Sequence, residues 1–244
     1  MSAPAPLKGK VALITGAGSG LGAALCDVLC RAGAMTIAAD IRLEAAQAIA
    51  DRVRDVDCTC TALQMDVSDE RSVGVSMEEA VAQFGGLDIV INNAGVDVTL
   101  PFDELRVEDW HRIIATNLTG PFLVSRHAVR RMRSRGSGHL VNIASTAAKR
   151  AWPNASAYHA SKWGLLGLSH ALHAELRGQG IKVSAVVAGG MRTPFLLERF
   201  PDIDLATLQD PRNVAQAVLN LLLMPAETVI PELTVLPMRE TSWP

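Results

Sequence analysis

Short apolar runs alternate with longer amphipathic segments along the whole chain. The runs are rich in β-branched residues and continuously apolar, as is typical of strands buried on both faces of a parallel sheet. They predict strands at 10–15, 34–40, 58–64, 87–93, 139–145, 181–187 and 228–236. The amphipathic segments predict helices at 20–32, 42–54, 69–84, 109–133, 155–178 and 211–224. The alternation predicts a doubly wound (Rossmann) α/β fold with a seven-stranded parallel sheet and helices on both faces, in which Pro231 restricts the last strand to an edge or a bulge.

One segment interrupts this alternation. Residues 189–210 carry Phe195, Leu196, Leu197 and Phe200 but show no strand pattern. A long apolar connection in a compact domain is often a lid or a binding loop, so we predict that 189–210 is a substrate loop. We see no linker, repeat or low-complexity segment, and we predict that residues 1–244 form a single domain.

Composition and charge narrow the class of protein. A 244-residue chain that is 49% hydrophobic and 20% charged suits a globular core, and its net charge of -2 gives no general attraction to nucleic acid or anionic membranes. No apolar run reaches the roughly 18 residues that span a bilayer, and the first ten residues lack the apolar core of a signal peptide. The five arginines of 126–136 suit a helix C-terminus better than a nucleic-acid patch. We expect a cytoplasmic protein with no nucleic-acid or membrane partner.

The four cysteines all lie in the first quarter of the chain. Cys26 and Cys30 share one face of a predicted helix, and Cys58 and Cys60 alternate along a predicted strand. No histidine lies near them in the sequence, so metal binding is only a weak alternative. We expect reduced, packed thiols and no metal site.

A glycine-rich stretch, "TGAGSGLG" at 15–22, follows the first predicted strand and opens the first predicted helix. Glycines let the backbone approach a pyrophosphate at a helix N-terminus, where free N–H groups and the helix dipole favour an anion. Two spacings fit such a site, one made by Gly18, Gly20 and Ala23 and a wider one made by Gly16, Gly20 and Gly22.

Asp40 ends the second predicted strand, about 20 residues beyond the glycines. A carboxylate at this place can accept hydrogen bonds from the ribose hydroxyls of adenosine, and it would repel a 2′-phosphate. The sequence therefore predicts NAD(H) as the cofactor, with Arg42 as the only nearby cation in favour of NADP.

Tyr158 is the only tyrosine, and it precedes Lys162 by four residues, on the same face of a predicted helix. A lysine ammonium beside the phenol favours the phenolate and lowers the tyrosine pKa, which would make Tyr158 a usable general acid or base. Ser145, at the end of a predicted strand, is placed to hold a substrate oxygen. The amide of Asn117 is suited to hold a water that relays protons to Lys162. An ordinary exposed pair of side chains is the alternative explanation for Tyr158 and Lys162.

Six pieces of the chain occur in the order found in the short-chain dehydrogenase/reductase family: "TGAGSGLG", Asp66 in "MDV", "NNAG" at 92–95, Asn117 in "TNL", Ser145 and "YHASK". The chain resembles that family over nearly its whole length. The resemblance implies a catalytic tetrad of Asn117, Ser145, Tyr158 and Lys162, and a homotetramer built on the helices at 109–133 and 155–178. The cofactor contacts that we assign are Gly16, Ser19, Gly20, Leu21, Gly22, Asp40, Ile41, Asp66, Val67, Asn93, Ala94, Gly95, Tyr158, Lys162, Gly189, Met191 and Thr193.

Two stretches depart from the family pattern. The segment "VVAGGMRTP" has Ala188 where the family has proline, and the chain ends in "PMRETSWP" instead of a glycine-rich sequence. Three further residues, Trp152, His159 and Trp243, suit either a substrate pocket or the filling of packing gaps.

We predict an NAD(H)-dependent oxidoreductase that interconverts a secondary alcohol and a ketone by hydride transfer. The apolar 189–210 loop favours a small to medium apolar substrate, including cyclic ones, while Arg150 and Arg192 leave room for a carboxylate or an acyl-carrier substrate. The alternatives are an NADP(H)-dependent 3-oxoacyl reductase and a catalytically inactive dinucleotide-binding sensor.

Overall fold

The computed structural model describes residues 5–54 and 58–240, and within them seven parallel strands form one sheet. The strands are β1 (Val11–Thr15), β2 (Met35–Asp40), β3 (Cys60–Gln64), β4 (Ile89–Asn92), β5 (Gly138–Ile143), β6 (Ile181–Ala188) and β7 (Glu232–Val235). Their order in the sheet is β3-β2-β1-β4-β5-β6-β7, which confirms the predicted doubly wound fold. The order reverses between β1 and β4, and open sheets of this kind bind ligands at the carboxyl ends of the strands near such a point.

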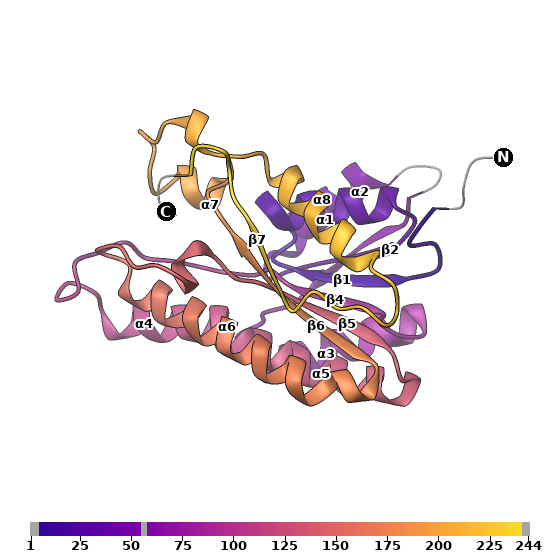
Figure 1. Cartoon of the computed structure of the whole chain (residues 1–244). Coiled ribbons are helices and arrows are strands. Elements are labelled where there is room, and N and C mark those ends of the chain that lie inside the picture. The colour runs from indigo at the N-terminus through magenta and orange to yellow at the C-terminus, as the bar shows by residue number, and fades with distance from the viewer. Residues whose placement is uncertain (1–4, 55–57, 241–244) are drawn as a thin grey trace.

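Helices cover both faces of the sheet (Figure 1). On one face lie α1 (Gly20–Arg31), α2 (Leu43–Val53) and α8 (Pro211–Leu222), and on the other lie α3 (Glu70–Phe84), α5 (Gly120–Arg135) and α6 (Ser156–Leu176). Each face packs its own large hydrophobic cluster against the sheet. Within the described ranges, no helix is both long and apolar enough to cross a membrane.

The single helix predicted at 109–133 is divided in the structure. It consists of α4 (Val107–Ile114), a π-helical turn (Ala115–Thr119) and α5. Pro121 near the start of α5 explains the division, because a proline lacks the N–H for the helical bond and its ring clashes with the carbonyl four residues earlier. That carbonyl belongs to Asn117, so the proline widens the turn that carries a predicted catalytic residue.

The predicted substrate loop contains two short helical turns, α7 (Pro194–Leu197) and a 3₁₀ turn (Leu205–Thr207). A bridge between Met191 and Gln209 joins the two ends of the segment. Figure 1 shows α7 projecting beyond the carboxyl ends of the strands. The loop is therefore anchored at its base and stands over the edge of the sheet where a ligand is expected.

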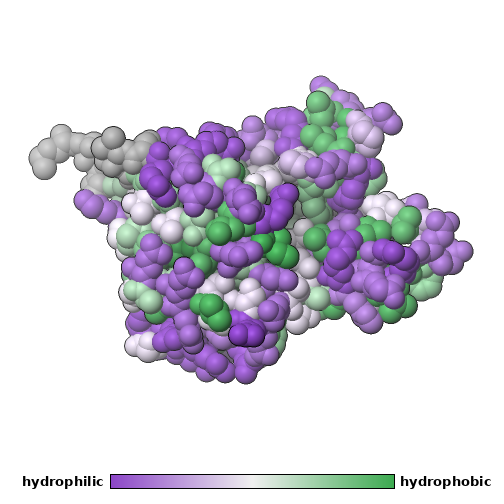
Figure 2. All heavy atoms as spheres, turned by 180° about the vertical axis from the view of Figure 1, so that it is seen from behind, coloured by the Kyte–Doolittle hydropathy of each residue, from purple (hydrophilic) through white to green (hydrophobic). Residues whose placement is uncertain are grey.

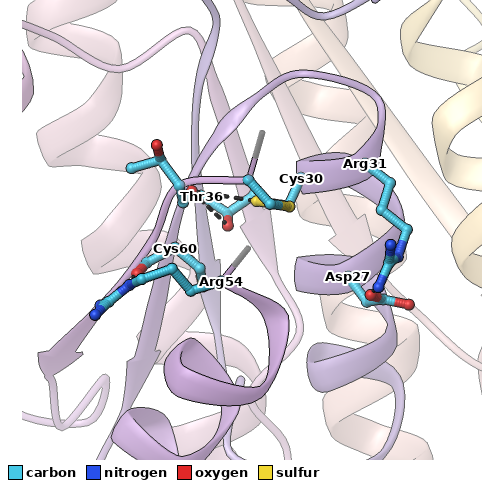
Figure 3. Close-up of a disulfide and its surroundings, with 8 residues drawn as sticks. Asp27, Cys30, Arg31, Thr36, Arg54 and Cys60 are labelled. Atoms are coloured by element: carbon cyan, nitrogen blue, oxygen red, sulfur yellow. Dashed lines mark hydrogen bonds and ion pairs between the residues drawn. A yellow bond between two sulfur atoms is a disulfide. The ribbon is translucent and has the colours of Figure 1, made fainter. Parts of the chain in front are cut away.

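The expectation of four reduced cysteines is wrong for two of them. Cys30 and Cys58 form a disulfide, which joins the last turn of α1 to the segment just before β3 (Figure 3). Helical and strand spacing alone did not reveal the pair, because α1 and β3 are brought together only by the fold. Cys26 and Cys60 are free and buried, as expected. A hydrogen bond from Cys26 lowers the pKa of the Cys60 thiol to about 7.

Candidate active site

A cavity of about 830 Å³ opens at the carboxyl ends of the strands. Its walls come from the segments that follow six strands, β1 to β6, and from the 189–210 loop. Figure 2 shows, from behind, a hollow between two projecting lobes with hydrophobic atoms on both rims. The cavity lies where the doubly wound fold is expected to bind its ligand.

The glycine loop forms one wall of this cavity. Gly16 has a φ of +63°, and a Cβ at this position would lie only 2.7 Å from the Cα of Ala94. The loop leads into α1, whose N-cap Ser19 makes no side-chain capping bond to the described residues and whose first turn contains no acid. Uncapped N–H groups at a helix N-terminus whose first turn carries no acid fit a pyrophosphate. The loop therefore fits the predicted dinucleotide.

Gly22 supports the glycine loop by close packing. It does not line the cavity, and a Cβ there would collide with the carbonyl oxygen of Gly16 and lie 2.7 Å from Nδ2 of Asn93. Asn93 in turn donates from Nδ2 to the carbonyl oxygens of Thr15 (2.9 Å) and Gly16 (3.1 Å). Gly22 is a close-packing glycine that supports the loop, and its contact with a cofactor stays a prediction.

Asp40 lies at the far end of the cavity with only 9% of its surface exposed. Its Oδ2 accepts from the backbone N–H of Gly18 at 2.9 Å, and its Oδ1 accepts from the backbone N–H of Arg42 at 3.0 Å. These two bonds fix the carboxylate beside the glycine loop. The guanidinium of Arg42 is on an exposed residue at the same end of the cavity.

Tyr158 and Lys162 lie one turn apart on α6, and both are buried. The Lys162 Nζ lies 5.6 Å from the centre of the Tyr158 ring and donates to the carbonyl oxygen of Ile143 at 2.8 Å. Ser145 shares a hydrogen bond with the Tyr158 hydroxyl. The alternative of an exposed pair is therefore wrong, because both side chains belong to a buried cluster that faces the cavity.

The pKa of Tyr158 differs from the sequence-based expectation. Burial raises it to about 12, although the hydrogen bond with Ser145 opposes the rise. Burial also lowers the pKa of Lys162 to about 8. The expected lowering of the tyrosine pKa does not occur, because removing the phenolate from water costs more than the hydrogen bond with Ser145 and the charge of Arg199 return.

Asn117 is fully buried in the π-helical turn and does not line the cavity. Its Oδ1 accepts from the N–H of Val96 at 2.8 Å, and its Nδ2 donates to the carbonyl oxygen of Val96 (2.8 Å) and to Oγ of Ser161 (3.1 Å). Both amide hydrogens are therefore committed to protein atoms. The side chain fixes the segment after β4 against α6, and the expectation that this amide holds a relay water stays a prediction.

The substrate end of the cavity lies between Tyr158 and the 189–210 loop. The Phe195 and Tyr158 ring centres are 6.0 Å apart, and Trp152 also lines this end. Of the four apolar loop residues named from the sequence, Phe195, Leu196 and Phe200 belong to this wall, and Leu197 is not among the described residues that line it. Sequence reasoning missed Asp97 and Arg199, which form an ion pair here, because no motif links two residues so far apart in the chain.

Four further residues that the sequence left open are His159, Trp243, Arg150 and Arg192. His159 is a packing residue: its Nε2 accepts from the N–H of Trp152 at 3.1 Å, and its Nδ1 lies 2.9 Å from the carbonyl oxygen of Ala147. Trp243 lies outside the described residues. Neither Arg150 nor Arg192 is among the described residues that line the cavity.

The two departures from the family pattern meet beside the cavity. Ala188 ends β6 and lines the cavity, and the next turn is held by the unusual C-terminal segment. Oε2 of Glu240 accepts from the N–H of Gly190 at 3.0 Å. A Cβ on Gly189 would also lie 2.8 Å from Cδ of Pro237. The C-terminal segment thus packs on the turn that lacks the usual proline.

The structure brings the predicted residues together. All but two of them, Gly22 and Asn117, line the one cavity. Such a site on a doubly wound sheet defines a dinucleotide-binding class of protein. A family model described as short chain dehydrogenase matches residues 10–204, and the chain belongs to that family of oxidoreductases.

Relatives and solved structures agree with this assignment. The chain is 40% identical over 180 residues to a D-threitol dehydrogenase of Mycolicibacterium smegmatis, covering 74% of this chain and 69% of that protein. It is 35% identical over 218 residues to a cis-4-hydroxycyclohexanecarboxylate dehydrogenase of Sinomonas cyclohexanicum, covering 86% and 87%.

A 3-ketoacyl-(acyl-carrier-protein) reductase from Brucella melitensis, solved with NADH, is similar at a TM-score of 0.86 and 31% identity, covering 96% of this chain and 99% of that one. A metagenomic short-chain oxidoreductase solved with NADP has a TM-score of 0.85 and 29% identity, covering 96% and 99%. Nicotinamide dinucleotides of both kinds therefore occur among the structural neighbours.

Proposed function

We propose that the protein is an NAD(H)-dependent oxidoreductase that interconverts a secondary alcohol and a ketone. The observation that carries the proposal is the buried cluster of Ser145, Tyr158 and Lys162 on the wall of a cavity whose other end holds Asp40. When bound, the cofactor supplies the acceptor or donor of a hydride.

The chain's own residues would supply the proton and the orientation. At neutral pH the Tyr158 hydroxyl, with a pKa of about 12, is protonated and therefore in the form that donates to a ketone oxygen during reduction. In the opposite direction the phenolate form of the same side chain would take the proton from the alcohol. Ser145 would hold the substrate oxygen as charge develops, while Lys162 fixes Tyr158 from one turn away. The Phe195 and Trp152 rings would keep water from the reacting atoms.

The cofactor preference rests on Asp40. Its carboxylate is fixed by two backbone N–H groups and is suited to accept from ribose hydroxyls, whereas a 2′-phosphate would face it at close range. The substrate class rests on the aromatic and apolar walls, which favour a small to medium, largely apolar alcohol. The relatives named above act, by their names, on a polyol and on a cyclic hydroxycarboxylate, both of which carry secondary alcohols.

The test is a screen of secondary alcohols and ketones with NAD(H) and with NADP(H), following the absorbance of the reduced nicotinamide. Tyr158→Phe removes the transferable proton and little volume, so we expect at least about a hundredfold loss of kcat with an unchanged fold. Wild-type turnover in a well-folded Tyr158→Phe protein would refute the role of the tyrosine. Preference for NADP with 3-oxoacyl substrates would favour the reductase alternative, and cofactor binding without any turnover would favour the sensor.

We also propose a homotetramer and a cytoplasmic location. Trp110 on α4, Phe122 on α5 and Trp163 on α6 are large exposed hydrophobic residues on neighbouring helices, which suits a subunit interface. An intracellular pool of the cofactor supports this location, while the Cys30–Cys58 disulfide is of a kind that is rare in the cytosol. Light scattering on the purified protein should give four times the mass of one chain, and a monomer in solution would contradict this interface.

A further inference from the structure

An ion pair stands at the substrate end of the cavity. Asp97 follows β4, Arg199 follows α7, and Nη1 of Arg199 bonds Oδ2 of Asp97. The Asp97 side chain is only 4% exposed and that of Arg199 is 20% exposed. Both residues line the cavity, so the pair presents a positive and a negative charge, with no net charge, to whatever enters.

The pair lies close to the predicted catalytic tyrosine. The Arg199 guanidinium carbon lies 4.0 Å from the centre of the Phe195 ring, and that ring lies 6.0 Å from the Tyr158 ring. The Tyr158 pKa responds first to burial and to Ser145, and then to both charges, since Asp97 raises it and Arg199 lowers it. A substrate held at Tyr158 is therefore within the electrostatic reach of both members of the pair.

The buried negative charge of Asp97 is compensated by Arg199. Its Oδ1 accepts from the N–H of Val98 at 2.8 Å, and its Oδ2 is taken by Arg199. Burial raises the pKa of Asp97, and Arg199 opposes the rise. Leaving a buried carboxylate without its partner is strongly unfavourable. A substrate carboxylate that competed for Arg199 would create that situation and would also meet the charge of Asp97.

The other cations that line the cavity are not placed to bind a substrate carboxylate. Among the described lining residues they are Arg42, Arg112 and Lys162. Arg42 lies at the opposite end, beside Asp40, and Arg112 pairs with Asp109 at 3.4 Å. Lys162 bonds the Ile143 carbonyl and supports Tyr158. A carboxylate at the substrate end would therefore have only Arg199 to bind, and Asp97 already holds it.

We propose that Asp97 is a specificity-determining residue that neutralises Arg199 and so restricts the site to uncharged alcohols and ketones. This inference rests on the proposed function, because it names the substrate class of the same site. A neutral hydroxyl or carbonyl can still accept a hydrogen bond from Arg199 without separating the pair. A carboxylate-bearing substrate of the same shape is excluded by charge.

The test compares two ligands that differ mainly in charge, cyclohexanecarboxylate and cyclohexanecarboxamide. Their binding to the full-length protein saturated with its preferred nicotinamide cofactor is measured by calorimetry at pH 7. We expect the wild type to bind the carboxamide at least about tenfold more tightly than the carboxylate, because the carboxylate is repelled by Asp97. A wild type that prefers the carboxylate would overturn the inference.

Asp97→Asn keeps the side-chain shape and frees the Arg199 charge, so the ratio should shift by at least about tenfold toward the carboxylate. The additional change Arg199→Gln should abolish that shift. Asp103→Asn is the matched control, because it removes one acid from an exposed site in the same segment and should keep the wild-type ratio.

An unchanged ratio in Asp97→Asn would refute the inference, and so would failure of that variant to bind the carboxylate at all, because the freed guanidinium should hold the anion. If circular dichroism shows that Asp97→Asn does not fold, the inference is judged from the wild type alone, by its ratio of carboxamide to carboxylate affinity. Failure of the proposed function is seen separately, as absence of alcohol turnover or an active Tyr158→Phe variant, and neither enters this binding ratio.

Discussion

Lys162→Met should remove a charge that the folded protein holds at a cost. Burial lowers the pKa of Lys162 from its ordinary value of 10.5 to about 8. A lysine whose pKa is lowered on folding destabilises the protein below its folded pKa, where both states are protonated but only the folded state buries the charge. The cost disappears as pH rises from the folded toward the unfolded pKa, because the unfolded chain then binds more protons.

The size of the effect follows from the two pKa values. The full cost is about 3 kcal/mol at pH 7, and about 2.5 kcal/mol of it is recovered by pH 10. The wild type should therefore gain about 2.5 kcal/mol more than Lys162→Met in free energy of unfolding between these two pH values. The upward shift of the Tyr158 pKa acts in the opposite direction above pH 10, but it is common to both proteins. The difference between the two proteins isolates Lys162.

The assay is urea unfolding of the cofactor-free protein, followed by circular dichroism at pH 7 and pH 10 and at one fixed protein concentration. Lys8→Met, which removes an exposed lysine, should follow the wild type. Parallel pH profiles for the wild type and Lys162→Met would refute the reasoning and show that the ammonium is solvated in the folded state. The expected result would also explain why the lysine is kept, since a residue that destabilises the fold needs a role at the site.

Two further predictions concern the disulfide and the substrate loop. Replacing Cys30 and Cys58 together by Ser should lower the free energy of unfolding by about 3 to 4 kcal/mol on the chain-entropy model for a pair 28 residues apart; reducing the wild type should have the same effect, and equal stability of the oxidised and reduced forms would contradict it. Hydrogen exchange should show 189–210 opening easily in the free protein and becoming protected with cofactor and substrate, whereas maximal protection without ligand would show that the segment belongs to the core.

The strands and most helices could be predicted because their signal is local. A strand such as β4, buried on both faces, needs a continuous apolar run, and the glycine loop needs backbone without side chains at fixed spacings. Pro121 carried a local signal for the divided helix as well, since its ring disturbs the turn at Asn117. The substrate loop could be located from its apolar residues, although its closure stays a prediction.

What the sequence did not reveal depends on contacts between distant segments. Asp97 and Arg199 are 102 residues apart in the sequence. A local motif does not reach so far, and only the fold places the two residues together. The hydrogen bond from Gly190 to Glu240 and the Cys30–Cys58 disulfide also join segments that are distant in the sequence. The Tyr158 pKa was misjudged for a related reason: the nearby lysine is visible in the sequence, but the burial that raises the tyrosine pKa is not.

The choice between NAD and NADP hangs on Asp40, whose two carboxylate oxygens already accept from the N–H groups of Gly18 and Arg42. Because these bonds fix the carboxylate, it cannot turn away from a 2′-phosphate. The full electrostatic repulsion between the carboxylate and the phosphate therefore opposes NADP binding. A conflict of about 2.7 kcal/mol is a hundredfold in kcat/KM, and we expect at least this preference for NAD. Asp40→Ser should remove most of it, because the two N–H groups then become donors available to a phosphate.

Adding Ile41→Arg to Asp40→Ser should turn the preference toward NADP through a charge-assisted contact. Ile41 is exposed at this end of the cavity, so the arginine has room. The matched control is Asp51→Ser, which removes an exposed acid from α2 and should leave the cofactor ratio unchanged. The measurement is kcat/KM for both cofactors with one substrate. A wild type that prefers NADP would mean that the exposed Arg42 outweighs the fixed carboxylate, and a ratio that survives Asp40→Ser would mean that the discrimination lies elsewhere in the site.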